Sequence, residues 1–229
     1  MTTRILPPPD RYAVCPSEGC VLEFYEGTFE AVYVLLHPFI RPPSISPGRF
    51  QQDTDTSRQR LCDSSKAVSW SDVLSFSGLK SLSEIDIALR TQIGGLNAKF
   101  AKLELAEALR NSLLKEGVLM PDEGKFSDLS HNKLLSFVKS QGYEWVWVGD
   151  EFCTQRKLHW IEDLMSPDSN ATDQCNVFTP DKKILWTTHW DSHFSFLCAS
   201  QNVVDAMAVD PNFEGFACSW ATEVYWSVS

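Results

Sequence analysis

Apolar residues recur at steps of three and four through the middle of the chain, the spacing that places side chains on one face of a helix. One run predicts a helix over residues 96–116 that Gly117 ends, because glycine readily adopts the backbone conformation found just past a helix. A second run predicts a helix over residues 130–141, which Gly142 ends. The buried face of the first helix has six members: Leu96, Phe100, Leu103, Ala106, Leu109 and Leu113.

Two shorter helices are expected before these. Ser69 or Ser71 can cap a helix that ends at Gly78, because a serine side chain accepts a hydrogen bond from the free N–H groups of a first turn. Ser83 and Asp86 have the spacing of a capping box, which predicts that the next helix begins there.

Other stretches have strand patterns. Residues 29–36 are β-branched and aromatic enough for a buried strand. Residues 143–148 alternate, so that their aromatic side chains share one face: Tyr143, Trp145 and Trp147. We interpret this stripe as sheet packing rather than as a recognition surface, because large aromatic side chains are mostly buried. A short amphipathic helix is expected next, over residues 154–165.

The C-terminal third is dominated by strand patterns. Residues 176–179 and 183–190 flank the turn-forming segment 180–182 and predict a hairpin. Four further elements follow in order: a strand over 194–199, a helix over 201–208, and final strands over 214–218 and 224–226.

This order predicts an α+β fold in one domain over residues 1–229. Helices come first and strands follow, which is typical of an antiparallel sheet rather than a doubly wound parallel one. Residues 1–67 are expected to form an irregular portion with one strand and a long loop over 41–67. Residues 68–229 are expected to form the main core, with the sheet built largely from 143–229.

The net charge of the chain limits which classes of binding partner are compatible with it. Twenty basic and thirty acidic residues give a net charge of −10, whereas nucleic-acid binding needs Lys and Arg to replace phosphate counterions. The same balance disfavours an anionic membrane surface. A basic protein partner is compatible with this charge.

The start of the chain has no apolar segment of the secretory kind, and no apolar run reaches membrane-spanning length. The seven cysteines are scattered and odd in number. We therefore expect a cytoplasmic protein with reduced thiols.

One short segment could bind a metal. On a continuous strand His189, Asp191 and His193 would share a face, and two imidazoles with a carboxylate suit a zinc or iron site with open positions. However, a strand through all three would be unusually long. The alternative is a turn at Trp190–Ser192, a hairpin tip with exposed histidines and with Asp191 bonding its own backbone.

A second candidate is Cys153, which follows Asp150 and Glu151 at an expected strand-to-helix junction. A helix N-terminus can lower the pKa of a thiol, but the two acids would oppose a thiolate. No histidine is tied to Cys153 by sequence, so a catalytic role requires a base supplied by the fold.

Other motifs are missing, including the nucleophile elbow, the phosphate-binding loop and the dinucleotide fingerprint. The C-terminal section resembles the tail of uncharacterised bacterial cytoplasmic proteins, and the chain is similar in style to immunity proteins that neutralise toxins. Four segments carry the resemblance: Phe178–Lys183, Leu185–Asp191, Phe194–Ser200 and Glu214–Cys218. The resemblance assigns no site residue.

Two hypotheses follow. The first is a non-catalytic protein-binding module, immunity-like, whose acidic surface docks on a basic partner. The second is a small metal-dependent enzyme that uses His189, Asp191 and His193. A pocket in which these three side chains converge would favour the enzyme.

Overall fold

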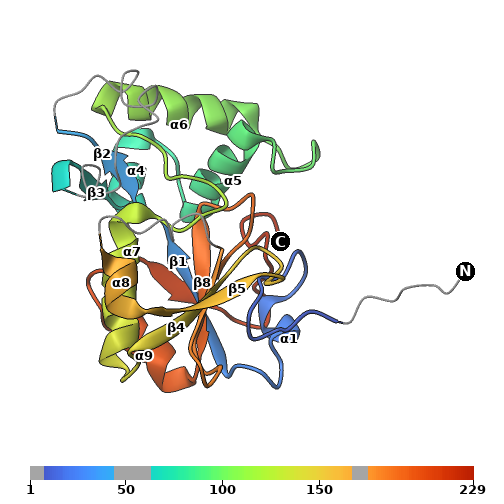
Figure 1. Cartoon of the computed structure of the whole chain (residues 1–229). Coiled ribbons are helices and arrows are strands. Elements are labelled where there is room, and N and C mark those ends of the chain that lie inside the picture. The colour runs from blue at the N-terminus through green and yellow to red at the C-terminus, as the bar shows by residue number, and fades with distance from the viewer. Residues whose placement is uncertain (1–7, 44–62, 167–174) are drawn as a thin grey trace, which may run out of the picture.

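The computed structural model describes residues 8–43, 63–166 and 175–229 (Figure 1). Within these residues the main sheet has seven strands in the order β5-β4-β6-β7-β8-β1-β9, and every neighbouring pair is antiparallel. The strands are β1 (Ala31–Leu36), β4 (Trp145–Gly149), β5 (Arg156–Trp160), β6 (Asn176–Phe178), β7 (Leu185–Thr188), β8 (Phe194–Ala199) and β9 (Gly215–Ala217). The predicted α+β fold with a largely antiparallel sheet is confirmed.

Helices cover one face of the sheet along its length. They are α7 (Asp128–Ser140), α8 (Ile161–Met165) and α9 (Gln201–Val209), and Figure 1 shows them along one side of the sheet. Leu134 of α7, Ile161 of α8 and Met207 of α9 join Val146 and Trp186 of the sheet in one buried cluster. We call this side the helical face.

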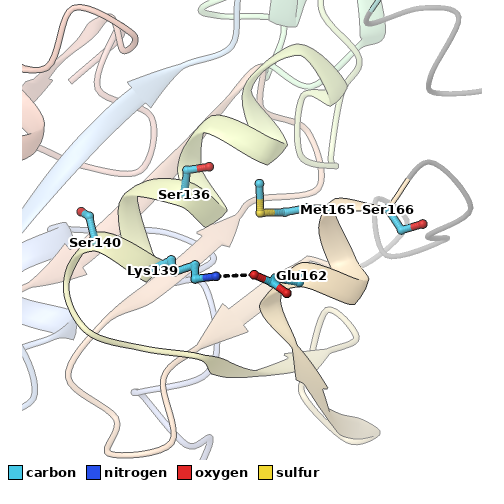
Figure 2. Close-up of a pocket in the computed structure, with 6 residues that line it drawn as sticks. All are labelled: Ser136, Lys139, Ser140, Glu162, Met165 and Ser166. Atoms are coloured by element: carbon cyan, nitrogen blue, oxygen red, sulfur yellow. Dashed lines mark hydrogen bonds and ion pairs between the residues drawn. The ribbon is translucent and has the colours of Figure 1, made fainter.

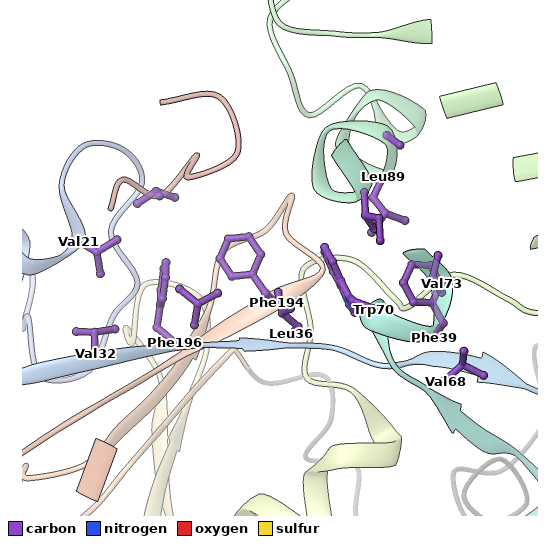
Figure 3. Packing of buried hydrophobic residues seen from close by; sticks show 14 of the residues in the cluster. Val21, Val32, Leu36, Phe39, Val68, Trp70, Val73, Leu89, Phe194 and Phe196 are labelled. Atoms are coloured by element: carbon purple, nitrogen blue, oxygen red, sulfur yellow. The ribbon is translucent and has the colours of Figure 1, made fainter. Parts of the chain in front are cut away.

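The opposite face is covered only in part. Its cover includes α1 (Val21–Phe24) and the C-terminal segment 218–229, and α4 (Trp70–Ser77) and α5 (Leu82–Ile93) join the same buried cluster. α6 (Leu103–Glu116) packs on α4 and α5 rather than on the sheet (Figure 1). Phe194 and Phe196 of β8 pack with Val21 and Trp70 in this layer (Figure 3). A separate two-stranded sheet, β2 (Phe39–Arg41) with β3 (Lys66–Val68), adjoins α4. We call this side the mixed face.

The N-terminal strand lies deep in the sheet. β1 pairs with β8 and β9, so that Val34 lies opposite both Phe196 and Phe216. All six β1 residues are buried, because both faces of the sheet are covered at this position. The sheet is therefore completed by a strand from outside 143–229. The expected long loop falls mostly on residues 44–62, which lie outside the described residues.

Local capping interactions determine where α4 and α5 begin and end. Ser69 caps α4 in a capping box with Asp72, and Gly78 ends the helix with a φ of 76°, as predicted. The α5 prediction was wrong by a few residues, because Ser81 rather than Ser83 accepts the hydrogen bond at the helix start. Asp86 instead lies inside α5 and is fully buried.

The helix predicted over residues 96–116 begins later, at Leu103. A turn around Asn97 precedes it, and the Lys102 N–H donates to Thr91. Leu96 lies in the segment before the helix and is buried there. Its match to the helical spacing was therefore misleading.

The helix predicted over residues 154–165 was also wrong in its first half. Asp150 accepts hydrogen bonds from the Thr154 and Gln155 N–H groups, which closes a turn and returns the chain as β5 beside β4. Only α8 is helical. The final strand expected over 224–226 is a turn.

Candidate functional site

The three predicted metal ligands flank a turn. β7 ends at Thr188 and β8 begins at Phe194, so His189, Asp191 and His193 lie in the connection between them. The chain adopts the turn of the alternative interpretation, but the exposed histidines expected with it were wrong, and the Asp191 carboxylate bonds other segments rather than its own backbone. His189 and His193 are both buried, whereas the side chain of Asp191 is 13 % exposed.

Asp191 is the centre of a polar cluster. Arg90 Nη1 donates to Asp191 Oδ1 at 3.0 Å, and the Tyr225 hydroxyl donates to Oδ2 at 3.0 Å. His189 Nδ1 forms an ion pair with the same carboxylate. Burial opposes the ionisation of Asp191, but the hydrogen bond and charge of His189, with Arg90, outweigh it and lower the pKa of the carboxyl.

Arg90 joins this turn to α5 and to the C-terminal segment. Its guanidinium is fully buried and pairs with Asp86 at 3.0 Å. It also donates to the Ser192 hydroxyl at 2.9 Å and to the Val224 carbonyl at 3.2 Å. The Tyr225 ring lies 4.5 Å from the guanidinium carbon. These contacts neutralise a buried charge and fix three segments together.

The two histidines bond to different parts of the chain. His189 Nε2 donates to the Ser17 carbonyl at 3.2 Å, whereas His193 Nδ1 is 3.0 Å from the Pro121 carbonyl. Burial lowers the pKa of His193. His189 and Asp191 are thus brought together, and His193 is directed elsewhere.

No three His, Cys, Asp or Glu side chains within the described ranges are grouped so that they could hold a metal ion. The zinc or iron site at His189, Asp191 and His193 stays a prediction, which elemental analysis of the purified protein would test.

Cys153 lies in the turn between β4 and β5 rather than at a helix start. Burial raises the pKa of its thiol, an effect that Arg156 only partly offsets. A protonated thiol is a weak nucleophile. The environment of Cys153 therefore does not activate it.

A pocket of about 210 Å³ lies beside His189. We call it the aromatic pocket, after six of its lining residues: Cys15, Phe24, Glu151, Phe152, His189 and Trp190. Burial raises the pKa of the Cys15 thiol far above its usual range, so that Cys15 is a neutral wall rather than a nucleophile.

Two further hollows are bordered by charged side chains. A groove between α7 and α8 is lined by Ser136, Lys139 and Glu162 (Figure 2), and Lys139 is paired with Glu162. A cavity of about 550 Å³ beside Tyr225 is lined by Glu18 and Glu223. The second cavity adds acidic groups close to the His189 turn.

An apolar surface lies at the β4–β5 end of the mixed face. Cross-strand register pairs Trp145 with Trp160 and Trp147 with Leu158, so the four side chains share one face. Trp145 is 42 % exposed and Leu158 is 39 % exposed. We call these four residues the open aromatic face. The interpretation of Trp145 as buried sheet packing was wrong, because Trp145 is substantially exposed, whereas Trp147 is partly buried against the mixed-face cluster.

The profile of a family described as "Protein of unknown function (DUF2711)" matches residues 17–228. The chain belongs to this family. It is also 25% identical over 165 residues to "Uncharacterized protein YwbB" of Bacillus subtilis (strain 168), which covers 70% of this chain and 72% of that protein. No solved structure matches. The resemblance to uncharacterised bacterial proteins is thus confirmed.

For this DUF2711 member, sequence reasoning missed Arg90 and the aromatic pocket. The Asp86–Arg90 spacing of four residues, within the apolar face of a helix, was a signal for a buried ion pair. The pocket had no such signal, since its walls come from four separate segments. Among the described residues no helix is both long and apolar enough to cross a membrane.

Proposed function

We propose that the protein is a non-catalytic protein-binding module for a basic partner, with an immunity-like inhibitor as its specific form. The observation that carries the proposal is the open aromatic face. Exposed tryptophans are enriched at the centres of protein interfaces, because they bury a large area with little loss of conformational entropy.

The edge strand supports the same proposal. β5 is the outermost strand of the main sheet on this side, so its outer backbone groups are available to an added strand. Trp145 and Trp160 are packed edge to face, with ring centroids 4.5 Å apart, so the aromatic surface is ordered before any partner arrives. Preorganisation of this kind reduces the entropic cost of binding.

The net charge of the chain suggests that the partner carries the opposite, positive charge. The net charge of −10 favours encounter with a basic protein and raises its association rate at low salt. Binding through the open aromatic face combined with this charge is expected to weaken in high salt without disappearing, since apolar burial is not screened.

The test compares two double variants in quantitative capture from the source cytoplasm. Trp145→Ser/Leu158→Ser removes the open aromatic face. Leu103→Ser/Leu114→Ser removes two α6 side chains that are 72 % and 61 % exposed and serves as the matched control. A basic protein retained by the wild type and the α6 variant, lost with the face variant, and confirmed by calorimetry as a direct ligand supports the proposal. Equal retention by all three proteins contradicts it.

A further inference from the structure

We infer that the aromatic pocket takes one arginine side chain of the partner as an anchor. This inference rests on the proposed function and names the chemistry by which the partner is held. It follows from the walls, the charge and the size of the pocket.

The pocket has fixed walls. Glu151 and Phe152 come from the β4–β5 turn, and Trp190 comes from the β7–β8 turn. Asn176 Nδ2 donates to the carbonyls of Asp150 and Glu151, at 2.6 and 3.0 Å. The first turn is therefore tied to β6. A ligand would meet a preformed site rather than two loose loops.

Two aromatic walls are unusually exposed. The side chain of Phe152 is 69 % exposed and that of Trp190 is 49 % exposed, although both border a concave site. A guanidinium is planar and weakly hydrated, so it stacks on aromatic faces more readily than an ammonium does. Phe24 already lies beneath Arg11, whose guanidinium carbon is 5.5 Å from the ring centroid. Phe152 and Trp190 are thus the walls open to a second guanidinium.

One carboxylate at the pocket is available to a cation. The side chain of Glu151 makes no hydrogen bond or ion pair in the described part of the chain, and only its backbone carbonyl is engaged. A carboxylate beside two aromatic rings matches the fork of an arginine, which can donate two parallel N–H bonds. An anionic group would be repelled by this carboxylate, and a neutral donor would hydrogen-bond to it without balancing its charge.

The volume also fits. Each water in the liquid occupies about 30 Å³, so a pocket of about 210 Å³ has room for a side chain of at least roughly seven non-hydrogen atoms. An arginine side chain has about that number beyond its Cα, and its methylene stem can lie against the neutral wall that contains Cys15.

The experiment uses small probes, so that it does not depend on finding the partner. Nα-acetyl-arginine methylamide is titrated into the isotope-labelled full chain, and the indole N–H signal of Trp190 is followed. We expect a saturable shift, about tenfold weaker for the neutral citrulline analogue because the ionic contact is lost. The lysine analogue is expected to bind more weakly than the arginine probe.

Two matched variants identify the site. Glu151→Gln removes the available carboxylate and is expected to weaken the arginine probe about tenfold. Glu26→Gln removes the same charge from an exposed position that does not line the pocket, and it is expected to bind the probe as the wild type does. Equal binding of arginine and citrulline, tighter binding of lysine, or equal losses in both variants would overturn the inference.

The failures of the two proposals are distinguishable. If the arginine probe shifts Trp190 but no partner depends on the open aromatic face, the pocket stands and the protein-binding module fails. If a partner depends on that face while the arginine probe leaves Trp190 unshifted, the pocket inference fails and the proposed function stands.

Discussion

Two parts of the main sheet differ in how deeply their large apolar side chains are buried. Toward the end opposite β4 and β5, at β8 and β1, which lie inside the edge strand β9, both faces are covered, and six consecutive β1 residues are buried. We call this part the covered end. At the β4–β5 end the helical face is covered, whereas Trp145 and Leu158 are exposed on the mixed face. We therefore expect the exposed apolar side chains at the β4–β5 end to contribute less to stability than the buried ones around β1. Four predictions test this contrast, in order of decreasing effect.

The largest loss is expected at the covered end. Arg90→Ala would leave Asp86 buried without its charge partner, which typically costs about 3–5 kcal/mol of unfolding free energy. Arg110→Ala on the exposed side of α6 is the control, with a change within about 0.5 kcal/mol. Urea unfolding measures the change in unfolding free energy of both variants. A loss at Arg90 no larger than at Arg110 would show that the buried cluster does not stabilise the fold.

Acid should destabilise the same end through His37. Burial, with the neighbouring His193, lowers the pKa of His37 to about 3, whereas an unfolded histidine titrates near 6.5. Between pH 6.5 and about 3 the unfolded state binds a proton at His37 that the folded state does not bind. Stability should therefore fall as pH drops from about 6.5 towards 3, by roughly 1.4 kcal/mol per pH unit.

His37→Gln checks this assignment. Ser195 accepts from Trp186 Nε1 at 2.8 Å and is hydrogen-bonded to His37 Nε2 at 3.1 Å, a contact that glutamine can replace without titrating. The urea midpoint of the variant, measured at pH 7, 6 and 5, should fall less steeply than that of the wild type. Identical slopes would assign the acid sensitivity to other groups.

A smaller effect is expected where Glu214 caps α4. Its carboxylate accepts from the Trp70 and Ser71 N–H groups, at 2.6 and 2.9 Å, and favours the positive end of the helix dipole. Glu214→Ala should cost about 1 kcal/mol, and Glu214→Gln less, because the amide oxygen still accepts. Thermal unfolding of the two variants ranks them, and the reverse order would argue against the cap.

The smallest effect is expected at the open end. Leu158→Ser should change the unfolding free energy by about 0.5 kcal/mol or less, because Leu158 is a surface residue that is 39 % exposed. A loss above about 2 kcal/mol would place Leu158 in the core and remove the contrast between the two ends of the sheet.

Local signals were sufficient for part of the fold. Ser69, Gly78 and the strand over 194–199 were predicted at or near their observed places, because caps and apolar runs act over a few residues. The β5 strand was missed because the apolar spacing at Leu158 and Ile161 also fits a helix. Its extended form depends on pairing with β4.

The site was less accessible to sequence reasoning. His189 and His193 are four residues apart, yet one bonds to Ser17 and the other to Pro121. Nothing in their spacing specifies those partners, which lie on distant segments. Arg90 was missed for the same reason, since its role depends on Asp191 and Val224 in the last part of the chain.

The position of β1 has a consequence for synthesis. Val34 pairs with Phe196, so the strand made near the start must wait for a partner made 162 residues later (196 − 34). At about 5–20 residues per second the ribosome needs roughly 8–32 s to supply it. During that interval an apolar strand has neither neighbour in place, and the nascent chain is an obvious client for the chaperones that shield such segments.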